Sequence, residues 1–236
     1  MTESPRVPLT RKRVVDAAME LIDADGAEAL SMRKLGAALG VEAMSLYNHV
    51  ANKDDLLDAV LDAALAEIQL PGAEGTWEER LRSLAEEFRR AGLRHPGVLP
   101  LFGARAIRSV EGIAPLACAY GILRGEGLEP HEALDAFMAL ASMVFGFMVV
   151  ELGGFTEMAR GGGVDYGAES FDDHPYLIEL GLAFAARDSD RGFDLACDVF
   201  LSGIRDLVDG VPHLEDPTGS VPGSRLRRPT PPPARM

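Results

Sequence analysis

Apolar side chains recur every three or four positions along most of the chain, a spacing that predicts amphipathic helices. The first such pattern follows Thr10, which can cap the amino end of a helix, and it stops at Asp25-Gly26. Alternation of apolar and polar residues, which is typical of half-buried strands, is scarce. We therefore predict an all-α fold.

Two short helical patterns joined at Gly40 follow the first helix. Ser31 can cap the first of them, and Gly40 supplies the left-handed backbone conformation that ends it. The second begins near Glu42, and its residues divide between two faces. The packing face carries Ala43, Leu46, Tyr47 and Val50, whereas the outward face carries Met44, Ser45, Asn48 and His49.

The outward face of the second pattern is polar and nearly uncharged, and its side chains have the size that reaches base edges when a helix lies in the major groove of DNA. Basic residues that suit phosphates flank it, namely Arg33, Lys34 and Lys53. The alternative is a helical hairpin with a solvated polar face, which two helices joined by a glycine would by themselves favour. The combined spacing favours a DNA-binding unit.

The segment SMRKLGAALGVEAMSLYNHVANKDDLL, residues 31–57, resembles the DNA-binding segment of the TetR family of bacterial repressors, and the resemblance covers about residues 9–57. It implies a homodimeric repressor that binds double-stranded, near-palindromic operator DNA and is released by a small-molecule effector. The resemblance also implies roles for single residues. Bases would be contacted by Arg33, Met44, Ser45, Asn48 and His49, and phosphates by Tyr47, Lys53, Thr10 and Lys34.

The formal net charge of −14 argues against a general nucleic-acid binder, because non-specific affinity comes mostly from neutralised phosphates. The charge is unevenly distributed. Residues 1–56 carry 7 Lys and Arg against 9 Asp and Glu, a net of −2, while residues 57–236 carry 16 against 28, a net of −12. An acidic body that repels DNA everywhere except at the docking face suits a sequence-specific binder.

Cys118 and Cys197 lie inside apolar helical patterns, which indicates buried thiols rather than a disulfide or a metal site. The first residues, MTESPRVPLTRKR, contain no apolar stretch of the kind that directs secretion, so we expect a cytoplasmic protein. The five histidines are scattered, and no catalytic motif spacing is found. We expect no enzymatic activity and no cofactor; the alternative is an all-helical enzyme that acts on a small apolar substrate.

The pattern after the DNA-binding unit predicts a helical body. Asn52 can cap a helix of about residues 53–70, which would connect the unit to the body. A later helix that opens at Glu129 contains an uncharged run of 15 residues, 136–150, shorter than the roughly 20 residues needed to cross a membrane. We interpret it as a buried helix that contacts the core on one side and a partner on the other, and we expect no membrane contact.

The resemblance implies that helices 131–152 and 190–208 form a four-helix interface with a second copy. Between them, residues 156–172 are typical of a loop and residues 175–186 of a helix, and residues 172–175 fit a helix cap better than a metal site. The composition near the carboxyl end predicts disorder. The predicted units are a helix-turn-helix domain (9–52), an effector-binding and dimerisation domain (53–210) and a disordered tail (211–236).

The body resembles that of the tetracycline repressors at HPGVLPLFGAR, residues 95–105, and at FGFMVVE, residues 145–151. Those repressors hold drug-bound magnesium through a histidine that aligns with Leu101, and leucine cannot bind a metal. Glu151 aligns with a glutamate of those repressors, although a solvated helix end explains it equally well. We therefore predict no metal site and a largely apolar effector in a pocket of Leu101, Phe102, Arg105, Leu116, Tyr120, Met138, Ser142 and Phe145, with Arg105 or Tyr120 orienting its polar group.

Overall fold

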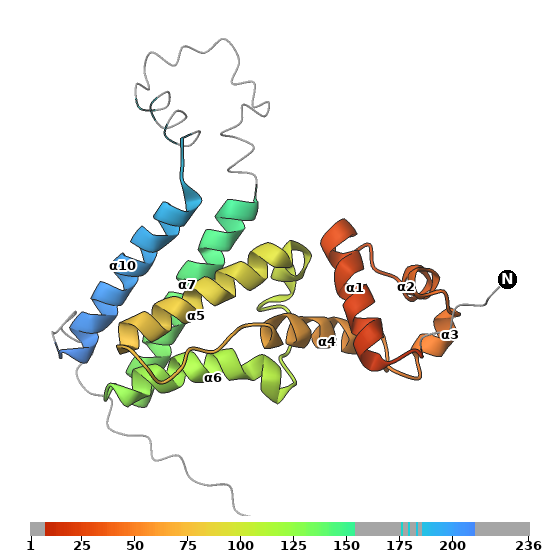
Figure 1. The fold of residues 1–236 in the computed structure, drawn as a ribbon, viewed down its shortest axis with the longest axis horizontal. Helices are drawn as coiled ribbons and strands as arrows, with labels where there is room; N and C mark the ends of the chain where they lie inside the picture. Colours follow the sequence, from red (N-terminus) through yellow and green to blue (C-terminus); the bar gives the residue numbers. More distant parts are fainter. Residues whose placement is uncertain (1–7, 154–175, 177–178, 180–182, 184–185, 211–236) are drawn as a thin grey trace, which may run out of the picture.

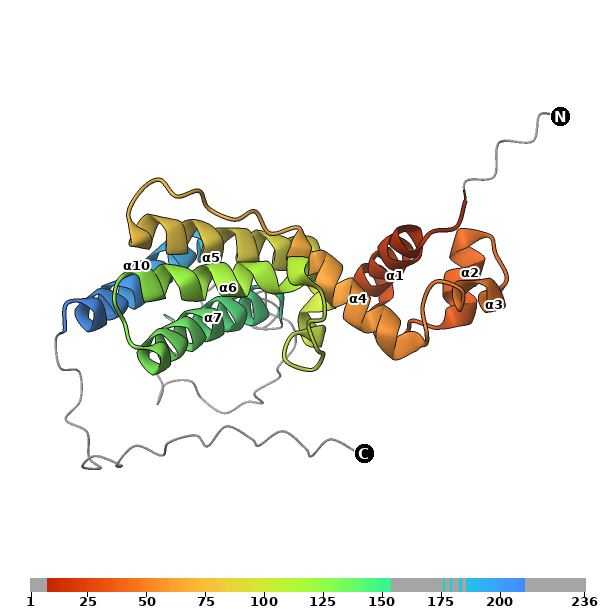
Figure 2. The ribbon, with the colours of Figure 1, turned by 90° about the horizontal axis from the view of Figure 1, so that it is seen from below.

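The computed structural model describes residues 8–153, 176, 179, 183 and 186–210. Within these residues every regular element is a helix, which confirms the all-α fold. The molecule is elongated, with a head of short helices at one end and a body of longer helices at the other (Figures 1 and 2).

The head contains three helices, namely α1 (Arg11–Asp25), α2 (Met32–Leu39) and α3 (Ala43–Leu46). The hydroxyl of Thr10 caps α1 by accepting a hydrogen bond from the N–H of Arg13, and the hydroxyl of Ser31 caps α2 by accepting one from the N–H of Lys34. Each cap satisfies an N–H that has no partner inside its helix, as the sequence pattern predicts. The core of the head includes the fully buried side chains of Val14, Ile22, Leu35 and Leu46.

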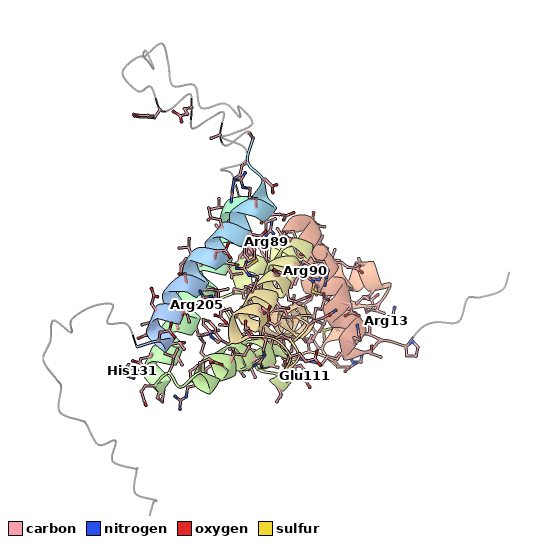
Figure 3. The ribbon with its side chains drawn as sticks, turned by 60° about the vertical axis from the view of Figure 1, so that its left-hand side comes forward. Arg13, Arg89, Arg90, Glu111, His131 and Arg205 are labelled. Carbon is pink, nitrogen blue, oxygen red and sulfur yellow. The ribbon has the colours of Figure 1, made fainter. Side chains whose placement is uncertain are left out.

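The body is built from α4 (Lys53–Ala66), α5 (Trp77–Arg94), the 3-10 helix η1 (Pro96–Leu101), α6 (Val110–Gly125), α7 (Pro130–Leu152) and α10 (Ser189–Val208). Helix α4 connects the two parts: it leaves the head and packs against α6 in the body (Figure 1). Helix α5 packs against α7, and α10 lies along α7 and α5 (Figure 3). The head is therefore joined to the body by a helix and not by a flexible linker.

Helices α7 and α10 expose apolar side chains within this chain. Half-exposed residues on α7 are Leu134, Met138, Val149 and Leu152, and exposed residues on α10 are Leu195 and Val199. Among the described residues, α7 alone is long and apolar enough to cross a membrane by length and composition. Exposed apolar surface of this kind is typical of contacts between protein molecules.

Four expectations fall outside the described residues. They are the loop at 156–172, the choice between a cap and a metal site at 172–175, most of the helix at 175–186, and the tail at 211–236.

Candidate nucleic-acid interface and ligand cavity

The turn between α2 and α3 brings the two helices into close contact. Gly40 ends α2 with φ 68° and ψ 32°, the left-handed conformation that its position in the sequence predicts. A Cβ on Gly36 would lie 2.9 Å from the carbonyl oxygen of Val41 and 3.2 Å from the amide nitrogen of Ala43. A side chain at Gly36 would therefore push α3 away from α2, so this glycine fixes the angle at which α3 is presented.

Helix α3 is only one turn long, and the residues after it continue as a tighter turn. The N–H of Tyr47 bonds to the carbonyl of Met44 at 3.3 Å, and the N–H of His49 bonds to that of Leu46 at 2.9 Å. Met44 is 75% exposed and Tyr47 is 43% exposed. The helical wheel places Tyr47 on the packing face, but the structure shows its side chain on the surface. Asn48 is exposed beside them, which gives a protruding face of three side chains.

The other two residues of the expected base-contacting face, Ser45 and His49, are half-buried. Within the described part of the chain, the side chains of these two residues and of Met44, Tyr47 and Asn48 make no hydrogen bond. Donors and acceptors on this face are therefore available to an external partner.

Arg11 holds the end of this face in place, a role that the sequence pattern does not predict. Its guanidinium donates to the carbonyl oxygen of His49 at 2.7 Å and to both carboxylate oxygens of Asp55 at 3.0 and 3.2 Å. Asp55 also accepts from the N–H of Ala51 at 2.8 Å. The hydrogen bond from Arg11, helped by the N–H of Ala51, holds the pKa of Asp55 below its usual range.

The two lysines among the expected phosphate contacts already have partners within the protein. The ammonium of Lys34 lies 2.5 Å from the carboxylate of Asp25, and that of Lys53 donates to the carbonyl of Leu30 at 2.6 Å. An ammonium has three N–H donors, so each lysine keeps donors for a phosphate. The hydroxyl of Thr10 accepts the cap bond and retains its own proton, and Arg33 is exposed.

An apolar cavity of about 390 Å³ lies in the body between α5, α6 and α7. Four phenylalanines border it, and the rings of Phe88 and Phe102 lie 5.3 Å apart, with those of Phe102 and Phe145 at 6.3 Å. Among the lining residues that the structure describes, only Ser142 carries a polar side-chain group, its hydroxyl. The lining residues are Leu65, Leu81, Leu84, Ala85, Phe88, Phe102, Gly103, Ile107, Pro115, Leu116, Ala119, Phe137, Met138, Leu140, Ala141, Ser142, Val144 and Phe145.

Five of the eight expected pocket residues border this cavity, namely Phe102, Leu116, Met138, Ser142 and Phe145. Leu101, Arg105 and Tyr120 do not. Leu101 is buried in the core at the end of η1, and the hydroxyl of Tyr120 donates to the carbonyl of Pro130 at 3.3 Å. The wall contributed by α5, Leu81 to Phe88, is absent from the expected set, because its helical spacing fits an ordinary core stripe equally well.

Arg105 points to α4 and not to the cavity. It lies 2.5 Å from the carboxylate of Asp54 and 3.7 Å from that of Asp58, which is almost fully buried. Arg108 approaches Asp58 at 2.7 Å, and its N–H bonds to Asp62 at 3.0 Å. Carboxylates one turn apart on α4 thus bind the segment that leads into α6. This segment is the cavity wall that carries Gly103 and Ile107.

Two family models together cover most of the chain. Residues 14–60 match bacterial regulatory proteins of the tetR family, and residues 70–208 match the tetracyclin repressor-like C-terminal domain. The chain belongs to the TetR family. The exposed α3 face lies within the first match, and the cavity lies almost entirely within the second.

Three TetR-family relatives are similar over different shares of their length. An HTH-type transcriptional regulator of Saccharopolyspora erythraea is 38% identical over 144 residues, 61% of each chain. The HTH-type transcriptional repressor DrrR1 of Streptomyces coeruleorubidus is 30% identical over 220 residues, 90% of this chain and 81% of that protein. The crystal structure of ActR from Streptomyces coelicolor in complex with actinorhodin is similar with a TM-score of 0.69 at 29% identity, covering 86% of this chain and 99% of ActR.

The magnesium-dependent drug site expected of tetracycline repressors does not fit the residues of this TetR-family chain. Leu101 offers no ligand atom, and both carboxylate oxygens of Glu151 accept hydrogen bonds from Arg89, at 2.9 and 2.7 Å. Within the described residues, no three His, Cys, Asp or Glu side chains are grouped so that they could hold a metal ion.

Proposed function

We propose that this chain is a transcriptional repressor that binds a near-palindromic operator as a homodimer and is released by a small apolar effector. The observation that carries the proposal is that an exposed face on the head and a cavity in the body lie in different parts of the molecule. The face formed by Met44, Tyr47 and Asn48 protrudes from the head at α3. The apolar cavity lies in the body between α5, α6 and α7, and Figure 2 shows these helices toward the other end of the molecule from α3. Helix α4 joins them as one element.

The proposed base contacts are Arg33, Met44, Ser45, Asn48 and His49, and the proposed phosphate contacts are Thr10, Lys34, Tyr47 and Lys53. The protrusion of Met44, Tyr47 and Asn48 supports the docking of α3 in a major groove, where its side chains meet base edges. Ser45 and His49 are half-buried, so they would reach base edges only if α3 lies deep in the groove. We assign residues 9–52 to this DNA-binding unit and residues 53–210 to the effector-binding and dimerisation unit.

The proposed dimer places α7 and α10 against the same helices of a second copy. The apolar side chains that both helices expose support this assignment, since an isologous contact would bury them all. The pairing would also present two α3 faces about 34–36 Å apart, one turn of DNA. A partner copy would cover α7, so its apolar composition needs no membrane, and we expect the protein in the cytoplasm.

The proposed effector is uncharged over most of its surface and binds without a metal ion. The lining is apolar except for Ser142, which supports an uncharged effector. A charged ligand would lose its hydration without gaining a partner in the cavity. Ser142 can donate one hydrogen bond or accept one. Arg105 and Tyr120, which bond elsewhere, would need to move before they could orient a ligand.

The effector would act by preferring a body conformation in which α4 holds the two heads at the wrong spacing for DNA. Its effect is limited by its preference for that conformation over the DNA-binding one. ActR, whose structure contains actinorhodin, is a relative of matching fold with a ligand bound. The relatives named above are regulators or repressors, and we do not propose the alternative of an all-helical enzyme.

Selection of binding sites from a random duplex library by the full-length protein tests the proposal. We expect enrichment of a near-palindrome whose half-site centres lie about 10 base pairs apart. The Tyr47→Ala variant should enrich it weakly. If a variant with Ser45, Tyr47 and His49 all changed to alanine enriched the same site equally well, the docking face would be assigned wrongly. A failure of the wild type to enrich any site would contradict the function itself.

A further inference from the structure

Helix α3 carries an exposed apolar side chain at the end of the head that lies away from the body (Figure 1). Met44 is the second residue of α3 and is 75% exposed. Among the described residues of the head, Met44 and Tyr47 are the exposed large hydrophobic residues, and they lie three positions apart. Single exposed apolar residues are common on protein surfaces. Two neighbours on a face that otherwise carries polar side chains indicate a contact with an apolar group of a partner.

The packing of α3 fixes the direction of Met44. A Cβ on Gly36 would lie 3.3 Å from the Cα of Ala43, so the first residue of α3 lies directly against α2. Leu46 is fully buried and anchors the same turn in the core of the head. Successive residues of a helix are about 100° apart around its axis, so the two positions that hold α3 leave Met44 on the opposite side. Its side chain therefore points away from the protein.

The chemistry of Met44 restricts what it can contact on DNA. Its side chain has no hydrogen-bond donor, and its sulfur is only a weak acceptor. Contact with a phosphate would remove water from a charged oxygen without supplying a hydrogen bond. The residues that suit phosphates are basic and lie on either side of α3 in the sequence, namely Arg33, Lys34 and Lys53.

The base edges offer one group that matches this side chain. In the major groove, base pairs display hydrogen-bond donors and acceptors together with the C5 methyl group of thymine, which is apolar. A thioether on an unbranched side chain is polarisable and adapts its shape to such a group. The exposed Asn48 differs in this respect, because its amide can donate and accept hydrogen bonds.

We propose that Met44 recognises the C5 methyl group of a thymine in each half-site of the operator. This inference rests on the proposed function, since it assumes that α3 lies in a major groove. It adds one base identity to the operator. The contact contributes no hydrogen bond, so the preference at this position depends on a single methyl group.

Replacement of thymine by deoxyuridine tests the inference, because it removes the methyl group and keeps every hydrogen bond of the base pair. The duplex is the site that the full-length protein enriches from the random library, with equivalent thymines of the two half-sites replaced together. At one such position we expect wild-type binding to weaken about fourfold per half-site and roughly 15-fold for both, as expected for one buried methyl group. Fluorescence anisotropy measures the affinities.

Two substitutions of Met44 separate the methyl contact from other effects of the base change. Met44→Ala should bind the thymine and deoxyuridine duplexes with affinities that agree within twofold. Met44→Leu keeps an apolar side chain of similar size and should still lose at least fivefold. Val110→Ala is the matched control, because Val110 is an apolar residue of 78% exposure on α6, in the body. It should show the same loss as the wild type.

The outcomes distinguish the methyl contact from the proposed function. A wild type that binds its operator but loses less than twofold at every thymine position would overturn the methyl contact alone. A loss that persists in Met44→Ala would do the same. A wild type that enriches no site from the library would contradict the proposed function, and the methyl contact with it.

Discussion

Arg89 on α5 binds Glu151 on α7 through two parallel hydrogen bonds, Nε to Oε2 at 2.9 Å and a terminal nitrogen to Oε1 at 2.7 Å. The two side chains are only 12% and 15% exposed. Figure 3 shows Arg89 beside α10, where it also bonds to Asp190 at 2.8 Å and lies over the ring of Phe193. Its hydrogen bonds to Glu151 and then to Asp190 raise the pKa of Arg89 above its ordinary value.

Replacement of Arg89 with methionine should destabilise the body by about 3 kcal/mol, because Glu151 would remain buried without its bidentate partner. Urea unfolding measures the free energy. Arg90→Met, on the same helix but 56% exposed, should cost less than about 1 kcal/mol. The double variant Arg89→Met, Glu151→Leu should recover part of the loss, since it leaves no buried carboxylate without its arginine; Asp190 is 87% exposed. Equal losses for Arg89→Met and Arg90→Met would contradict the buried character of the pair.

The stability that Asp55 contributes should be lost in acid. Its pKa is lowered in the folded head, so the contribution is fully present above the unfolded pKa of about 3.9 and disappears as the pH falls through the lower folded value. We expect Asp55→Asn to be less stable than the wild type by about 1 kcal/mol at pH 7, and the difference should shrink below about pH 4. Urea midpoints across this range measure it. A difference that is the same at pH 7 and pH 3 would argue against the ionised contact with Arg11.

Lys53 and Asn48 should affect DNA binding in different ways. Lys53→Ala should weaken binding to all duplexes and reduce the slope of log affinity against log salt concentration by about one, as expected for one lost phosphate contact. Asn48→Ala should leave the slope unchanged and alter which sequences are preferred. Fluorescence anisotropy with the selected operator and a scrambled duplex, at several salt concentrations, separates the two effects. A salt slope that changes with Asn48 and not with Lys53 would reverse the assigned roles.

Metal ions should have no effect on effector release. Leu101 cannot bind a metal, and Glu151 is held by Arg89, so tetracycline with magnesium should leave operator binding unchanged. Operator binding measured with tetracycline, with and without magnesium and with a chelator, checks this. Release that requires magnesium and is abolished by the chelator would show that the site accepts a metal–drug complex after all.

Local features of the fold are readily predicted from the sequence. Thr10, Ser31 and Asn52 each accept a hydrogen bond from the N–H three residues later, because capping depends on neighbours in the chain. The left-handed Gly40 is a local feature of the same kind.

Features that depend on distant residues are not predicted in this way. Arg105 is placed in the pocket by its position in the sequence, but it pairs with Asp54, 51 residues earlier, because α4 and the segment before α6 pack side by side. Asp58 looks like a polar residue at the edge of an apolar stripe, and only the packed structure shows it buried against two arginines. The role of Arg11 follows from a contact with Asp55 across 44 residues, which no periodicity indicates.

Met138 lies both in the wall of the cavity and on the exposed surface of α7. It borders the cavity, and it is 52% exposed on α7, the helix that we assign to the dimer contact. After a gene duplication, a substitution at this position that admits a new effector would also change which copies pair. The daughter protein would then respond to a different signal and at the same time avoid mixed dimers with its parent, so a single mutation would begin to separate the two regulatory circuits.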